Sequence, residues 1–279
     1  MRILFIGDVY GRPGRDLVRR ALPALADRYG IDLTIANVEN ASAGSGITRE
    51  TGDEILGRGV DVMTTGNHVW DRREAITYVG AEPRLLRPAN MSPLAPGRGA
   101  TVARTRAGRP VGVVNVMGRV YMPPVDDPFA AASAAVARLA DDCRVIVVDM
   151  HAEATAEKVA MGWHLAGKVA AVIGTHTHVQ TADARVLPGG TAYITDVGMT
   201  GPHDGIIGVA REAALARFLT GLPGKFEPAE GNPRLQAVVI TVDDETGRAT
   251  AIERLDWAHD DVQQARAQLA ERGGGDDER

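Results

Sequence analysis

Short apolar runs alternate with stretches of helical periodicity through the first two thirds of the chain. Each run is bounded by Gly, Asp, Asn or Pro, which is typical of a buried strand between turns. The predicted strands cover residues 2–7, 32–38, 60–66, 111–116, 144–150 and 169–174. Helices are predicted between them, near residues 13–29, 48–58, 71–79, 127–140 and 154–166. This alternation predicts an α/β fold.

The pattern changes after residue 184. The segments ARVL and TAYIT flank Gly189-Gly190 and predict one hairpin, and LQAVVITV and RATAIERL flank DDETG and predict another. A mixed sheet follows from hairpins added to parallel strands. Residues 84–110 are rich in Pro, Gly and Arg, and we expect long loops there around the short strand ATVAR.

Neither a linker nor an internal repeat divides the chain. We therefore expect a single domain over residues 1–258, followed by a C-terminal helix and disordered tail over 259–279 that ends in GGGDDER.

Composition narrows the class of protein. With 279 residues, 44% of them hydrophobic, the chain can bury a large core. No stretch approaches the roughly 20 apolar residues that cross a bilayer, and Met1 leads directly into a strand, so we expect a cytoplasmic protein without a membrane partner. The single cysteine, Cys143, excludes an intramolecular disulfide and a thiolate metal cluster. A net charge of −5 argues against binding long nucleic acid.

Polar side chains follow five of the predicted strands, at the point where each strand ends. These residues are Asp8, Glu39, Asn40, Asn67, His68, His151, His176 and His178. In α/β sheets this edge is where ligands bind. Any one of them alone is explained as a cap or turn residue, but all eight together are not. Because side chains at i and i+2 of an extended chain point the same way, His176 and His178 can aim at one point.

The residue types suit a borderline metal ion bound through oxygen and nitrogen, and they are numerous enough for two ions. Two divalent ions bring a charge of about +4, of which the carboxylates of Asp8 and Glu39 cancel about 2. The site then stays positive, so an acidic protein can still attract a phosphate ester.

Several motifs carry a resemblance to a known family. They are GDVYG at 7–11, VENAS at 38–42, GNHVWD at 66–71, MHAE at 150–153, GTHTHVQ at 174–180 and ITDVGMTGPHDGIIG at 194–208. In this order they resemble the calcineurin-like metallophosphoesterases, and most of all their YmdB family, bacterial proteins regarded as phosphodiesterases of cyclic nucleotides such as 2′,3′-cyclic AMP. The broader superfamily begins with Asp-x-His, whereas here Val9 and Tyr10 follow Asp8, and Glu39-Asn40 replaces its bridging Asp. The YmdB family shares both changes.

The resemblance implies an α/β fold in which two mixed β-sheets pack as a sandwich flanked by helices (α/β/β/α). It also implies a ligand set for two metal ions, with iron (Fe2+/Fe3+) or Mn2+ expected. One ion would be held by Asp8, Glu39, Asn40 and His178, and the other by Glu39, Asn67, His151 and His176, with Glu39 bridging. Metal-activated hydroxide would then attack phosphorus.

His68 is assigned to catalysis, as the general acid that assists the leaving oxygen. The alternative is that His68 only orients a ligand. Glu153 is a candidate partner of the metal ligands, and His203 either lines the pocket or lies solvated in a loop. Candidates for contact with the substrate phosphate are Arg84, Arg87, Arg98 and Arg104.

The leading hypothesis is a dinuclear phosphodiesterase acting on a small phosphoester such as a cyclic nucleotide. A phosphomonoesterase or nucleotidase with the same metals is the enzymatic alternative, and a metal-binding regulatory protein with little catalysis is the other. The sequence leaves a homo-oligomer open. The loops at 84–110 and 117–128 are candidates for either a pocket wall or a subunit contact.

Overall fold

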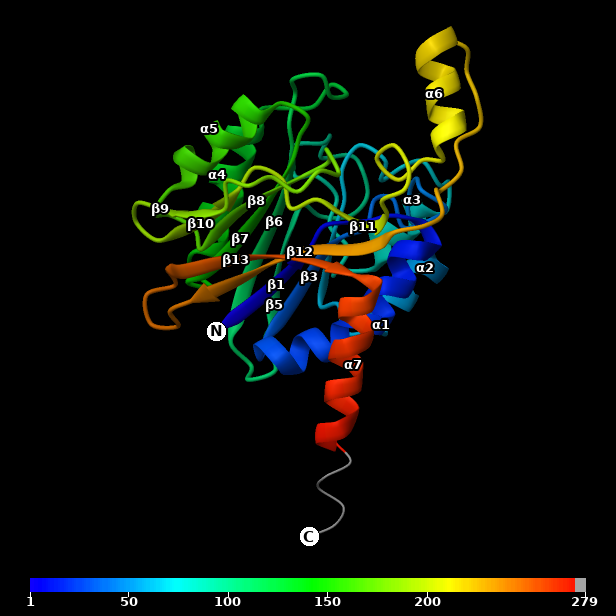
Figure 1. Cartoon of the computed structure of the whole chain (residues 1–279). Coiled ribbons are helices and arrows are strands. Elements are labelled where there is room, and N and C mark those ends of the chain that lie inside the picture. The colour runs from blue at the N-terminus through cyan, green and yellow to red at the C-terminus, as the bar shows by residue number, and fades with distance from the viewer. Residues whose placement is uncertain (274–279) are drawn as a thin grey trace.

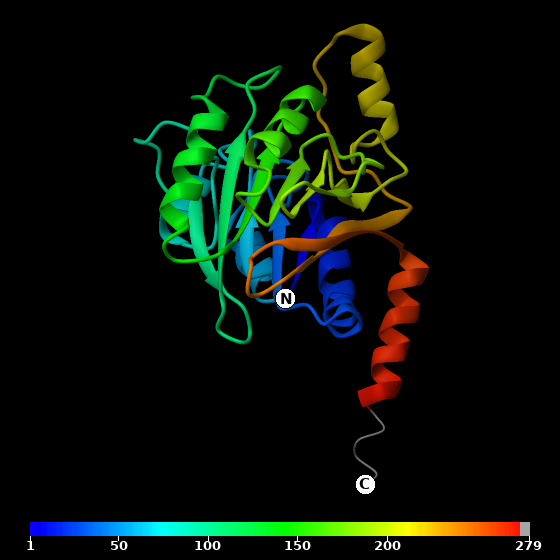
Figure 2. The same ribbon diagram turned by 90° about the vertical axis from the view of Figure 1, so that its left-hand side faces the viewer.

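Two β-sheets stacked face to face form the centre of the protein, and helices cover their outer faces (Figures 1 and 2). The structure is a computed structural model and describes residues 1–273. The sandwich of two mixed sheets flanked by helices confirms the fold class predicted from the sequence.

The first sheet has the order β2-β11-β12-β1-β3-β4, with β13 paired to β12. Its strands are β1 (Arg2–Ile6), β2 (Asp8–Val9), β3 (Leu33–Asn37), β4 (Val62–Thr64), β11 (Met199–Pro202), β12 (Pro233–Val242) and β13 (Ala249–Ala258). The pairs β1–β3 and β3–β4 are parallel, whereas β12 runs antiparallel to β1. The carboxyl ends of β1, β3 and β4 therefore meet at one edge.

The second sheet has the order β5-β6-β7-β8-β10-β9. Its strands are β5 (Ala100–Arg104), β6 (Pro110–Met117), β7 (Val145–His151), β8 (Ala171–Thr175), β9 (Arg185–Leu187) and β10 (Thr191–Ile194). The four central strands are parallel, and the antiparallel edge strands β5 and β9 close the sheet.

Helices divide between the two outer faces. Those packed against the first sheet are α1 (Gly11–Tyr29), α2 (Arg49–Leu56), α3 (Ala75–Ala81) and α7 (His259–Gly273). Those packed against the second are α4 (Pro128–Leu139) and α5 (Thr155–Leu165). In contrast, α6 (Arg211–Thr220) projects from the body of the molecule in both views (Figures 1 and 2).

The apolar runs are continuous because successive side chains point to opposite faces of a strand and both faces are buried. In β1, Ile3 and Phe5 lie in the core between the sheets, whereas Leu4 and Ile6 pack under the helices. A strand buried on both faces needs apolar residues at every position, and a strand half exposed to water does not. The unbroken runs in the sequence therefore mark the central strands.

The predicted strands and helices of the first 200 residues are all present, as are both predicted hairpins. Helix α6 and the short strands β2 and β11 were not predicted from the sequence, whereas a C-terminal helix was. Val262 and Ala265 of α7 are buried against the first sheet's helical layer. The predicted disordered tail falls on residues 274–279, outside those the structure describes. Within residues 1–273, no helix is long and apolar enough to cross a membrane.

Candidate metal centre

The carboxyl ends of strands from both sheets deliver the predicted site residues to one edge of the sandwich. Asp8 follows β1 directly, and Glu39 follows β3. His151 ends β7 in the opposite sheet, and His176 follows β8. The site therefore lies across the junction of the two sheets, so that its geometry depends on how the sheets are packed.

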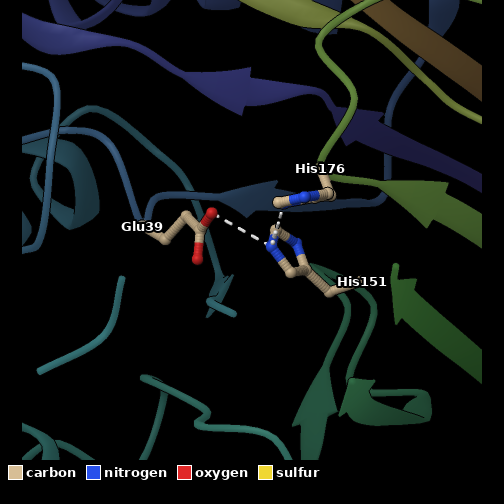
Figure 3. Close-up of side chains that lie close together, drawn as sticks. All are labelled: Glu39, His151 and His176. Atoms are coloured by element: carbon tan, nitrogen blue, oxygen red, sulfur yellow. Dashed lines mark hydrogen bonds and ion pairs between the residues drawn. The ribbon is translucent and has the colours of Figure 1, made fainter. Parts of the chain in front are cut away.

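Glu39, His151 and His176 form the tightest group (Figure 3). One ligand atom from each lies within 4.8 Å of the others. Nε2 of His151 is 3.0 Å from Glu39 Oε1 and 3.1 Å from Nδ1 of His176. The same nitrogen is 3.1 Å from Asn67 Oδ1. The four residues expected to hold the second ion are thus brought together around one point.

Three of the four residues expected to hold the first ion also converge, namely Asp8, Asn40 and His178. Nε2 of His178 is 3.3 Å from Asn40 Oδ1 and 3.8 Å from Asp8 Oδ1. The other carboxylate oxygen of Asp8 accepts the backbone N–H of His176 at 3.3 Å, which joins the two groups.

The hydrogen bonds around His178 determine which atoms face the centre. Nδ1 of His178 lies 2.8 Å from the Ile207 carbonyl, which can only accept, so that nitrogen carries the proton. The Asn40 amide nitrogen donates to the Gly44 carbonyl, which turns its oxygen toward His178. Burial lowers the pKa of His178, so its Nε2 is an unprotonated acceptor. Nε2 and Asn40 Oδ1 therefore face each other with no proton between them, and Asp8 Oδ1 lies beside them.

Two buried carboxylate oxygens also lack a donor. Among residues 1–273, neither Asp8 Oδ1 nor Glu39 Oε1 accepts a hydrogen bond, although both side chains are almost fully buried. The 3.0 Å approach of His151 to Glu39 is close enough for an ion pair, but its angle is not that of a hydrogen bond. Burying acceptors without donors is costly, and a cation between them removes the cost. These atoms thus fit bound metal ions.

In the metal-free centre, burial and the neighbouring charges set the pKa values of the ionisable side chains. Burial works against a charged His151, but the neighbouring Glu39 carboxylate outweighs it and raises the pKa of His151 to about 9. Burial likewise works to raise the pKa of Glu39, yet the charge on His151 lowers it to about 2. Burial raises the pKa of Asp8 and, with the charge on His151, lowers the pKa of His176 to about 3. A proton on His151 must leave before that nitrogen can bind a metal.

Local backbone geometry places the histidines. His176 and His178 have φ values of 101° and 64°, which residues other than glycine rarely adopt. Asp196 holds this turn from behind, since one of its carboxylate oxygens accepts the backbone N–H and the hydroxyl of Thr177. Gly66 leaves room for His151, because a Cβ at residue 66 would lie 2.0 to 2.5 Å from that ring.

His68 lies beside the centre and its ring does not contact the expected ligands. Its backbone N–H donates to Glu39 Oε2 at 3.0 Å, while Nδ1 lies 2.7 Å from Asp71 Oδ2. The side chain is 39% exposed, so a substrate can reach it. Asp71, which also bonds the Ser45 hydroxyl, was missed by the sequence analysis. Its spacing of three residues from His68 within GNHVWD was the available signal.

Other residues singled out in the sequence each have a different partner in the structure. Glu153 Oε2 lies 3.2 Å from His176 Nε2, as a partner of a ligand should. Tyr10, which stands where the superfamily has a ligand histidine, packs edge-on against His178 with ring centroids 5.6 Å apart. His203 bonds the Gly201 carbonyl through Nδ1.

Three of the loop arginines have partners within the protein. Arg87 is buried and its guanidinium donates to the backbone carbonyls of Pro88, Ala95 and Pro96. Arg84 is paired with Glu82, and Arg104 with the Gly108 carbonyl.

Comparisons with known proteins identify relatives that match nearly the whole chain. A Bacillus subtilis protein named 2′,3′-cyclic-nucleotide 2′-phosphodiesterase is 50% identical over 255 residues, which cover 91% of this chain and 96% of that protein. A crystal structure of a hypothetical protein from Thermus thermophilus superimposes with a TM-score of 0.86 at 44% identity, covering 92% of this chain and 99% of the other. A crystal structure of a novel phosphatase from Mycoplasma pneumoniae gives the same TM-score at 33% identity, covering 92% and 93%.

The family model described as YmdB-like protein matches residues 4–255. This range includes every residue of the candidate metal centre. With the family model and the relatives in agreement, the chain belongs to the YmdB-like family.

Proposed function

We propose that this phosphoric ester hydrolase is a phosphodiesterase of small cyclic nucleotides, such as 2′,3′-cyclic AMP, that works with two bound metal ions. The observation that carries the proposal is the pair of facing acceptors, His178 Nε2 and Asn40 Oδ1, beside the Asp8 carboxylate oxygen that has no hydrogen-bond donor among residues 1–273. The class of enzyme rests on the relatives. The substrate is inferred from the name of the Bacillus subtilis protein, 2′,3′-cyclic-nucleotide 2′-phosphodiesterase.

The residues proposed to hold the ions are Asp8, Glu39, Asn40, Asn67, His151, His176 and His178. Oxygen and nitrogen donors without sulfur suit iron or manganese. When bound, the ions supply positive charge that stabilises the phosphoryl oxygens and makes water more acidic. Glu39 is proposed to serve both ions, as the family resemblance implies; it is fully buried and its Oε1 faces His151.

His68 is proposed to protonate the leaving oxygen. Asp71 accepts Nδ1–H and so fixes the ring, which leaves Nε2 for the substrate. Among residues 1–273, Nε2 of His68 has no protein partner.

A substrate panel with metal analysis tests the proposal. Freshly purified protein is analysed for metal, and hydrolysis of 2′,3′-cyclic and 3′,5′-cyclic nucleotides, nucleoside monophosphates and bis-p-nitrophenyl phosphate is then measured. We expect bound iron or manganese and the highest kcat/KM on a cyclic nucleotide. A preference for monophosphates would favour the phosphomonoesterase alternative. Bound metal without hydrolysis of any ester would favour the regulatory alternative.

A further inference from the structure

A buried carboxylate lies directly behind the candidate metal centre. Asp149 on β7 is 0% exposed, and among residues 1–273 it has no lysine or arginine partner. Its oxygens accept from the hydroxyl of Thr175 at 2.7 Å, from the hydroxyl of Thr64 and from the Asn37 amide at 3.3 Å. A buried carboxylate without a cation is unfavourable unless it is fully hydrogen-bonded, so its presence here calls for a reason.

The partners of Asp149 come from both sheets. Asn37 ends β3 and Thr64 ends β4 in the first sheet, whereas Thr175 ends β8 in the second. All of them are fully buried. This network therefore crosses the sandwich one layer below the edge that carries the metal centre.

The order of donors and acceptors in the network fixes the state of one metal ligand. Thr175 donates its hydroxyl proton to Asp149, so its oxygen accepts from Nδ1 of His151 at 2.8 Å. The Asn37 amide nitrogen comes no closer than 3.4 Å to the same Nδ1, which makes Thr175 the nearer partner. With its proton on Nδ1, a neutral His151 presents a bare Nε2.

The Asn37 amide is itself oriented. Its oxygen accepts the backbone N–H of Glu39 at 3.2 Å, so its NH2 group faces Asp149. Every contact of the carboxylate is then a donor, and Thr175 has no acceptor nearer than Asp149 for its proton. Nε2 of His151 points at Glu39 and His176, as Figure 3 shows, and lies 3.1 Å from Asn67 Oδ1.

We propose that Asp149, acting through the Thr175 hydroxyl, is a positioning residue that holds His151 with Nδ1 protonated and Nε2 ready to bind a metal. This inference rests on the proposed function, since it assigns His151 to a metal. Residues that hydrogen-bond a ligating histidine fix its tautomer and ring orientation, and losing them typically lowers metal affinity about 10- to 100-fold.

Mn2+ titration of chelator-stripped full-length protein tests the inference, with free Mn2+ followed by electron paramagnetic resonance. Thr175→Val keeps the shape of the side chain and removes the hydroxyl. We expect it to weaken one of two bound equivalents of Mn2+ by about 10- to 100-fold, because His151 would hold only one of the two proposed ions. Thr175→Ser keeps the hydroxyl and should restore binding.

Thr64→Val is the matched control, because Thr64 donates to the same carboxylate without touching His151. It should bind both equivalents like the wild type. Asp149→Asn provides a second test if Thr175→Val does not fold, and should show the same selective loss. The inference is overturned if Thr175→Val binds like the wild type, or if Thr64→Val loses as much affinity. A wild-type protein that takes up no Mn2+ or iron would instead refute the proposed function.

Discussion

Replacing Lys158 by methionine removes one half of a buried ion pair and should destabilise the protein strongly. Nζ of Lys158 donates to Asp196 Oδ2 at 2.7 Å, and the side chains are 1% and 0% exposed. Breaking such a pair from one side costs about 3 to 5 kcal/mol, because a buried charge is left without its counter-charge. Asp196 keeps hydrogen-bond donors from Thr177 and Gly198, so we expect a loss at the lower end of this range, about 3 kcal/mol. For a chain of this size, that lowers Tm by roughly 6 to 12 °C.

Urea unfolding of the wild type, Lys158→Met, Asp196→Asn and the double variant measures the effect. Once both charges are gone no isolated ion remains, so the double variant should lose less stability than the sum of the single losses. Lys168→Met is the control, since Lys168 is exposed and bonds only a carbonyl; a change within about 0.5 kcal/mol is expected. A loss below about 1 kcal/mol for Lys158→Met, or additive losses, would refute the reasoning.

Three further predictions concern the centre itself. Gly66→Ala should abolish metal binding in elemental analysis, because the new Cβ would overlap the His151 ring; retained metal would contradict this. His68→Ala should lower kcat by about 10²- to 10⁴-fold with metal content unchanged, and loss of both metals would show that His68 serves the ligands instead. Chelation should lower Tm in calorimetry, and returning the metal should restore it. If the free metal had stood at 100 times Kd, removing it lowers the free energy of unfolding by about 2.7 kcal/mol. An unchanged Tm would argue against a bound ion.

Much of the centre could be predicted because the polar side chains that form it stand just after the ends of strands. The strand ending at Ile6 is followed by Asp8, and the strand ending at Asn37 is followed by Glu39, so a local pattern places both at one edge. The structure brings these residues together with His151 and His176, as the sequence analysis expected. Their role as metal ligands remains a prediction.

The residues that support the centre were not predictable in the same way. Asp149 sits inside a run of valines, and nothing local reveals that its partners are Asn37 and Thr64 in the other sheet. The carbonyl of Ile207 fixes His178 from 29 residues away. The arginines proposed for phosphate were assigned from charge alone, whereas burial directs Arg87 to backbone carbonyls.

The sequence by itself determined which segments are buried strands and which chemical groups stand at their ends. Both follow from interactions between near neighbours and from the alternation of side chains along a strand. Only the tertiary structure decided that β3 and β4 lie opposite β7 and β8, and hence which nitrogen of each histidine faces the centre. Those choices depend on donors and acceptors more than 20 residues apart, whose positions are fixed only when the two sheets pack.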